Sequence, residues 1–171
     1  MCTLDKFYFV DKALNLGAKH AVAFNIDDIV FDSRTLIKCM FGCSDWGKGN
    51  TCPSKAGSLK PWEYKKIFEE YSWGIIIHAN DKKVSQEVSF EIERDAFAKG
   101  FYFSFSLSDC SICTQCAGHK GKDCIDQKRA RPAFHSVGID VFKTVRKFNL
   151  PIETLSCKDQ TQNWYSAVFI E

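Results

Sequence analysis

The sequence predicts a single α/β or α+β domain, built on one sheet with helices packed around it. Two observations support this fold class. Short runs rich in β-branched and aromatic residues alternate along the chain with longer amphipathic runs. Seven of the nine cysteines fall in two groups between these runs. Alternating strands and helices are typical of a compact sheet domain, and we expect both cysteine groups to lie in loops leaving that framework.

The first half of the chain carries strand and helix signals in turn. Residues 21–31 (AVAFNIDDIVF) are rich in β-branched and aromatic side chains and predict one or two strands. Residues 61–73 open with Pro61, a favoured first helical residue, and mix apolar with charged side chains, which predicts a helix. Residues 74–79 (GIIIHA) form a continuous apolar run, typical of a strand covered on both faces.

The second half continues the alternation. From Val84 onward, apolar residues recur at every fourth position, and Gly100 ends the predicted helix. Residues 101–107 (FYFSFSL) alternate large apolar with smaller or polar side chains and predict a strand. Residues 131–150 predict a helical region interrupted at its central glycine, and residues 164–171 (WYSAVFIE) predict a closing strand.

The totals are those of an ordinary globular protein. The chain has 171 residues, with 45% hydrophobic and 26% charged residues, and we expect residues 1–171 to form one domain. A net charge of +2 without acidic or basic blocks argues against nucleic acid as a partner. No apolar run approaches the roughly 20 residues of a membrane helix. The first residues lack the apolar core of a secretion signal, so we expect a cytoplasmic protein that does not bind membranes.

The nine cysteines are the one unusual total. Disulfides are typical of secreted chains with an even cysteine count, whereas this count is odd and no secretion signal is seen. In a reducing compartment, such clusters more often bind metal or perform chemistry. Two cysteines, Cys2 and Cys157, stand apart from the groups, and each is expected to be an ordinary thiol.

The second cysteine group has the spacing C-x2-C-x2-C-x7-C. Three closely spaced cysteines and a more distant fourth resemble the bacterial ferredoxin run, in which the fourth cysteine often ligates a different cluster. A single zinc ion is usually held by two separated pairs. The spacing therefore favours a [4Fe–4S] cluster over zinc. The proposed ligands are Cys110, Cys113, Cys116 and Cys124.

Zinc remains an alternative for the same segment. Cys113, Cys116, His119 and Cys124 can be arranged as C-x2-C-x2-H-x4-C, which approaches a zinc-knuckle pattern. That assignment leaves Cys110 without a role. With zinc, the chain would be a zinc-stabilised binding module.

The first group, Cys39, Cys43 and Cys52, has the spacing C-x3-C-x8-C and is followed by Pro53, as in the Cys-Pro that ends the ferredoxin run. Three cysteines do not complete a four-thiolate site. A second [4Fe–4S] cluster would have its fourth iron held by Cys157, by another residue or by none. Alternatively, the groups exchange ligands, with Cys52 completing the cluster of the second group.

The expected function depends on whether a cysteine binds the fourth iron of the cluster. Clusters fully capped by thiolates suit electron transfer or another redox process. An iron without a cysteine could act on a substrate as a Lewis acid, which would make the protein an enzyme. For that case Asp45, Arg131 and Asp140 are the first polar residues to test. The two residues after the second group, Arg131 and Asp140, have an alternative role in bracing the metal loop by hydrogen bonds.

Basic residues crowd the second cysteine group. Cations near a cluster of thiolates raise its reduction potential. The basic residues of this segment form a solvated face, a docking face for an acidic redox partner protein or a pocket for an anionic ligand. The residues are Lys120, Lys122, Lys128, Arg129 and Arg131.

Several motifs together carry a family resemblance. The first group combines a C-x3-C pair with Trp46-Gly47-Lys48 and Cys52-Pro53, and Ser54 stands where the family has a second proline. The helix end matches Glu-Arg-x-x-Phe-x-x-Gly at residues 93–100, and the three-cysteine run follows it. The most specific match is Ala130-Arg131-Pro132 followed by Gly-Ile-Asp-Val at residues 138–141.

With these motifs the chain resembles an uncharacterised family of predicted metal-binding proteins, known only by a domain-of-unknown-function label. The resemblance extends from about Cys39 to the C-terminus. The family often has Arg-His-Pro after its fourth cysteine, where this chain has Ile-Asp-Gln at residues 125–127. The resemblance implies a metal-binding, iron–sulfur protein, and it implies no particular reaction.

Overall fold

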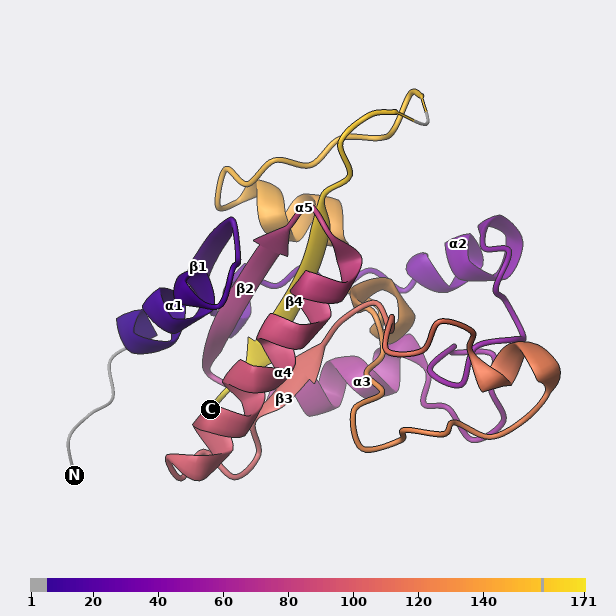
Figure 1. Cartoon of the computed structure of the whole chain (residues 1–171), viewed down its shortest axis with the longest axis horizontal. Helices are drawn as coiled ribbons and strands as arrows, with labels where there is room; N and C mark the ends of the chain where they lie inside the picture. The colour runs from indigo at the N-terminus through magenta and orange to yellow at the C-terminus, as the bar shows by residue number, and fades with distance from the viewer. Residues whose placement is uncertain (1–5, 158) are drawn as a thin grey trace.

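The fold is α+β, with one four-stranded antiparallel sheet between two sets of helices (Figure 1). The structure is a computed structural model that describes residues 6–157 and 159–171; Cys2 lies outside these residues. The strand order is β1-β2-β4-β3. The strands are β1 (His20–Asn25), β2 (Trp73–Ala79), β3 (Phe105–Leu107) and β4 (Trp164–Phe169). The helices are α1 (Lys6–Asn15), α2 (Thr35–Gly42), α3 (Pro61–Phe68), α4 (Lys82–Ala98) and α5 (Val141–Arg146), and the short 3₁₀ helices are η1 (Ile26–Asp28), η2 (Ala117–Lys120) and η3 (Phe134–Val137).

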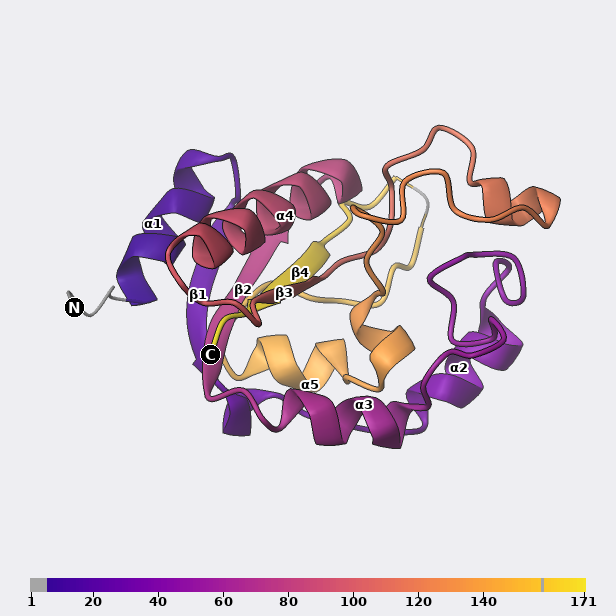
Figure 2. The same ribbon diagram turned by 90° about the horizontal axis from the view of Figure 1, so that it is seen from below.

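Helices α1 and α4 cover one face of the sheet (Figure 2). The apolar residues at every fourth position of α4 are buried there, as the sequence pattern predicts. A polar contact joins the same two elements, because Ser85 Oγ on α4 donates to Ser166 Oγ on β4 at 2.9 Å. Helix α4 begins at Asp81, whose carboxylate accepts a hydrogen bond from the Val84 amide at 2.9 Å.

The opposite face of the sheet is covered by α3, α5 and η3 (Figure 2). Here the rings of Phe68 and Phe169 lie with their centroids 4.4 Å apart. Gly138, with a φ of 91°, separates η3 from α5, which confirms the predicted interruption of this helical region. The carboxylate of Asp140 then caps α5 by accepting a hydrogen bond from the Lys143 amide at 2.9 Å.

Strand β2 lies in the interior of the sheet between β1 and β4. All seven of its residues are buried, which confirms the strand predicted from its continuous apolar run. At Gly74 a Cβ atom would lie 2.2 Å from the Val168 carbonyl oxygen, so only glycine fits between the strands at this position.

Two predicted strands are shorter in the structure than in the sequence-based prediction. Residues 21–31 contain β1 and then η1, so the second part is a 3₁₀ turn with one isolated bridge from Phe31 to Ile139. Residues 101–104 form a turn instead of the start of β3. Gly100 has a φ of 100° and reverses the chain after α4, so that the Phe101 ring packs against Trp73 with centroids 5.8 Å apart.

The expectation that both cysteine groups lie entirely in loops was wrong for the first group. Cys39 is a buried residue of α2, and Cys43 is the residue that ends this helix. The second group does lie in a long connection between β3 and η3 that contains only η2. Among the described residues, no helix is long and apolar enough to cross a membrane.

Candidate metal centre

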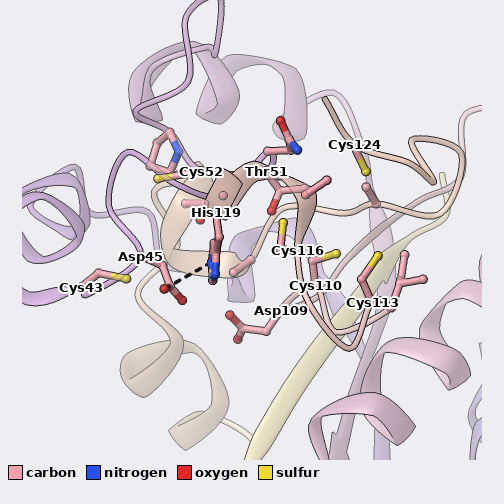
Figure 3. A pocket seen from close by; sticks show the side chains of 18 of the residues that line it. Cys43, Asp45, Thr51, Cys52, Asp109, Cys110, Cys113, Cys116, His119 and Cys124 are labelled. Carbon is pink, nitrogen blue, oxygen red and sulfur yellow. Dashed lines mark ion pairs between the residues drawn. The ribbon is translucent and has the colours of Figure 1, made fainter. Parts of the chain in front are cut away.

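One cavity brings together the seven grouped cysteines. It has a volume of about 160 Å³ (Figure 3), and the segments that carry these cysteines lie at the end of the molecule away from α1 (Figure 1). In Figure 3 the second group and the first group approach it from different stretches of backbone. The cysteines that line it are Cys39, Cys43, Cys52, Cys110, Cys113, Cys116 and Cys124.

The first cysteine segment is a chain of tight turns after α2. The Cys43 amide donates to the Cys39 carbonyl at 3.3 Å, which ends the helix between the two thiols. Ser54 donates a hydrogen bond from Oγ to the Cys52 sulfur at 2.9 Å and accepts one from the Gly47 amide at 2.9 Å. Ser54 therefore supplies a hydrogen bond to the sulfur of a candidate ligand.

The second cysteine segment is held at both ends by Gln86 of α4. This side chain is 4% exposed, and its Oε1 accepts hydrogen bonds from Ser111 N at 2.6 Å and Ser111 Oγ at 3.0 Å. Its Nε2 donates to the Arg129 carbonyl at 3.5 Å. Because Ser111 directly follows the first cysteine of the group and Arg129 follows the last, one buried amide joins the two ends of this segment.

Arg131 and Glu93 form a buried ion pair beside this loop. Arg131 Nε donates to Glu93 Oε2 at 2.9 Å, and a second bond joins Arg131 Nη2 to Glu93 Oε1. The guanidinium also donates to the Lys128 and Ala130 carbonyls, while Glu93 Oε2 accepts from the Ser106 amide at 2.7 Å. These contacts tie the return of the loop to α4 and β3, so Arg131 braces the loop.

The two cysteine segments also contact each other. Asn50 Nδ2 donates to the Lys122 carbonyl at 3.1 Å, and Asp45 Oδ1 lies 3.5 Å from His119 Nε2 (Figure 3). At Gly118 a Cβ atom would lie 2.2 Å from the Lys48 carbonyl oxygen. This close approach requires glycine in η2 and holds the two groups at one site.

The cysteines that raise the pKa of Cys39 or Cys113 belong to the same sequence group as the thiol they affect. Burial raises the pKa of Cys39 to about 11, with further increases from Cys43, Cys52 and Asp109. Desolvation also raises the pKa of Cys113, with contributions from Cys110, Cys124, Cys116 and the nearby Asp126. The thiols of each group therefore act on one another, and bound cations would relieve this crowding of negative charge once the thiols ionise.

Of the other candidate residues from the sequence, some line this cavity and some do not. Asp45 and His119 line the cavity, whereas Arg131 and Asp140 do not. Arg131 braces the second cysteine loop by hydrogen bonds, whereas the side chain of Asp140 caps α5 through the Lys143 amide and not the loop. Cys157 is exposed and does not line the cavity.

Sequence reasoning missed Asp109 and His135, which also line the cysteine cavity. Asp109 directly precedes Cys110, and that adjacency was a signal in the sequence. His135 lies in η3, far from every cysteine in the sequence, and only the packing of η3 under the sheet brings it to the site.

The donor set at the cavity fits a thiolate-bound metal group. Thiolates are the preferred ligands of both zinc and iron–sulfur clusters. Within residues 6–157 and 159–171, no three Cys, His, Asp or Glu side chains stand close enough to hold a single metal ion as they are placed.

Comparison with known families places the chain in one class. Residues 23–170 match the family described as "Predicted metal-binding protein (DUF2284)", and the chain belongs to this family. The match confirms the resemblance seen in the sequence and identifies a predicted metal-binding protein. Searches of curated proteins and of solved structures gave no match.

Proposed function

We propose that the protein binds iron–sulfur clusters through its seven grouped cysteines and acts in electron transfer or another redox process. The observation that carries this proposal is the single cavity lined by all seven thiols. One structural zinc ion takes four ligands, so it would leave three cysteines of this cavity without a role. A [4Fe–4S] cluster also takes four cysteines, and two clusters account for all seven with one iron left over.

The assignment of ligands follows the electrostatic grouping of the thiols. Cys110, Cys113, Cys116 and Cys124 would hold one cluster. Cys39, Cys43 and Cys52 would hold three irons of a second cluster. When bound, the clusters supply the capacity to accept and donate single electrons. The chain positions them through the buried Gln86 and the Glu93–Arg131 pair.

The surface near the second group supports exchange of electrons with an acidic partner protein. Lys120, Lys122, Lys128 and Arg129 are exposed, whereas Arg131 is buried and does not contribute to that surface. Exposed cations attract an acidic partner over distances of about a Debye length, roughly 8 Å at physiological salt. We therefore infer that electrons pass through this basic surface.

An enzyme is the second candidate function, and the three-cysteine composition of the first group favours it. Seven of the described cysteines line the cavity, one fewer than the irons of two clusters, so one iron of a second cluster has no thiolate from this set. Cys157 does not supply it, because this residue is exposed and does not line the cavity. Such an iron supplies Lewis-acid chemistry. The carboxylate of Asp109, which raises the pKa of Cys39, is the side chain of this protein that would act beside such an iron.

Metal analysis of anaerobically purified protein tests the proposal. Iron, acid-labile sulfide and zinc are measured per chain. We expect about eight iron atoms and an equal number of sulfides for two clusters, or about four of each for one cluster. Stoichiometric zinc without labile sulfide would contradict the proposal and favour the zinc-stabilised module.

A further inference from the structure

A second cavity adjoins the cysteine cavity. Its volume is about 250 Å³, and it lies between η3, α5, β4 and the segment that leads into β4. Asp109 and His135 line both cavities, so they form the wall between them. Figure 3 shows Asp109 below Cys110 and Cys116 in the cysteine cavity. A molecule in the second cavity would therefore lie directly beside the candidate metal centre.

The two wall residues have unused hydrogen-bonding capacity. Within the described part of the chain, neither the Asp109 carboxylate nor the His135 imidazole forms a hydrogen bond or an ion pair. Both side chains are only half-buried. An acid and a base that are held in place without partners can each bind a polar group of a ligand.

Four of the other ten described residues that line the cavity are aromatic. Tyr165 donates its hydroxyl hydrogen to the Pro151 carbonyl at 2.5 Å and thus presents its ring rather than its hydroxyl. Phe134 is buried, and Phe142 and Trp164 are partly exposed. Aromatic rings arranged around a small cavity favour a planar ring as the ligand, because they stack on its face or meet its edge.

The charged side chains that line the cavity are acidic. Two carboxylates, Asp109 and Glu153, line it, and its lining within the described residues contains no lysine or arginine. Two cations lie near the cavity without lining it: Lys82 Nζ is 5.3 Å from the centre of the Trp164 ring, and the Arg146 guanidinium is 5.4 Å from the centre of the Phe142 ring. A carboxylate or phosphate ligand is therefore disfavoured where it would lie beside Asp109 or Glu153. A cationic or hydrogen-bond-donating group would instead find acceptors in Asp109 and Glu153.

We propose that this second cavity binds a small aromatic molecule that carries a cationic or hydrogen-bond-donating group, with the ring against Trp164 and Phe142 and the polar group at Asp109 and His135. The substrates of the protein would then be single-ring aromatic molecules with a cationic or hydrogen-bond-donating group, bound beside the candidate metal centre. Binding itself requires only the fold, whereas the use of the bound molecule as a substrate rests on the proposed metal function.

Fluorine NMR of the anaerobically purified full chain labelled with 5-fluorotryptophan tests the proposal. The four tryptophans give separate resonances, and Trp164→Phe assigns the one at the cavity. Three probes of equal shape are titrated: benzamidine as the cation, benzamide as the neutral donor and benzoate as the anion. We expect benzamidine to shift the Trp164 resonance in a saturable way, benzamide to do so more weakly and benzoate to leave it unchanged.

Two variants locate the binding. Asp109→Asn should weaken benzamidine binding by about tenfold, since it removes a charge-assisted hydrogen bond. Asp11→Asn, a matched change on the exposed side of α1, should leave binding unchanged. Phe142→Ala should also weaken binding, because it removes part of the aromatic wall. A Trp164 resonance that no probe shifts, or equal binding of benzoate and benzamidine, would overturn the proposal.

The metal content of the same sample separates this proposal from the preceding one. Saturable benzamidine binding to protein without labile sulfide would support the cavity and contradict the iron–sulfur function. Iron and sulfide present in full with no shift of Trp164 would support the clusters and overturn the aromatic site.

Discussion

At the scale of single residues, the buried polar side chains stabilise the site more than they take part in chemistry. Arg131 was a candidate for substrate contact, yet its guanidinium is paired with Glu93 and directed at backbone carbonyls of the second cysteine loop. The two side chains are 11% and 13% exposed. A buried pair costs much to break, because removing one partner leaves the other charge uncompensated.

Glu93→Gln should therefore lower the free energy of unfolding by about 3 kcal/mol, as expected for breaking a buried ion pair. Denaturant unfolding monitored by circular dichroism measures the change. The control is Glu91→Gln on the same helix, where Glu91 and Arg94 form an exposed pair at 3.0 Å. That control should cost less than about 1 kcal/mol. Equal losses in both variants would show that Arg131 does not depend on Glu93.

His78 is the second residue with a measurable consequence. It is 1% exposed on β2, its Nδ1 lies 2.8 Å from His20 Nδ1 and its Nε2 lies 2.8 Å from Asn163 Oδ1. Burial lowers the pKa of His78, although the Asn163 hydrogen bond opposes the shift. The unfolded chain therefore takes up a proton before the folded chain does, and stability falls as the pH drops through the ordinary histidine pKa of about 6.5.

His78→Leu should flatten this pH dependence. The free energy of unfolding is compared at about pH 8 and about pH 5.5, which lie on either side of the histidine pKa. Acid also weakens thiolate–metal bonds, but it does so in both proteins, so the difference between them isolates His78. An equal loss of stability in the variant and the parent would contradict a buried neutral His78.

At the scale of elements, helix α4 organises the second cysteine segment. It packs on the sheet through its apolar stripe and reaches the loop through Gln86, which contacts both Ser111 and Arg129. Residues outside the coordination sphere that orient metal ligands commonly change metal affinity by about 10–100-fold when they are removed. Gln86 has this position for the second group.

Gln86→Ala should therefore weaken metal retention by about tenfold. Transfer of metal from the anaerobic protein to a chelator measures the loss. The matched control is Glu87→Ala, since this neighbouring side chain is exposed and pairs with Lys83 at 3.7 Å. Retention equal to that of the parent protein would mean that the loop keeps its shape without Gln86.

Elements with a regular pattern could be predicted from the sequence, and elements that depend on distant packing could not. Strands β2 and β4 and helix α4 follow their apolar patterns closely. Helices α1 and α2 were not predicted. In α1, Phe9 and Ala13 are buried at helical spacing, but the exposed Phe7 and Tyr8 obscure the pattern. In α2, exposed apolar residues such as Phe41 leave no clear polar face.

The candidate site also has features that could be predicted from the sequence and features that depend on distant packing. The seven cysteines could be identified from spacing alone, and the cavity brings all of them together. Their common location could not be predicted, because it depends on contacts such as that between Gly118 and the Lys48 carbonyl. His135 reaches the site only through the tertiary position of η3, for which no local pattern exists.

At the scale of the whole molecule, the sheet and its helices hold two cysteine segments at one end of the fold (Figure 2). One cavity then contains the thiols, and a second cavity meets it at Asp109 and His135. This arrangement brings the candidate metal centre, the exposed basic residues and the second cavity together on one framework of helices around a four-stranded sheet. The central claim is that both cysteine groups, and not Cys157, hold the metal.

Iron and labile sulfide per chain, measured in three serine variants, test this claim most directly. Cys52→Ser and Cys113→Ser alter one thiol in each group, and Cys157→Ser alters the exposed thiol outside the cavity. We expect the first two variants each to lose iron and sulfide, and Cys157→Ser to keep the full content of the parent protein. Full content in either group variant, or a loss in Cys157→Ser as large as theirs, would contradict it.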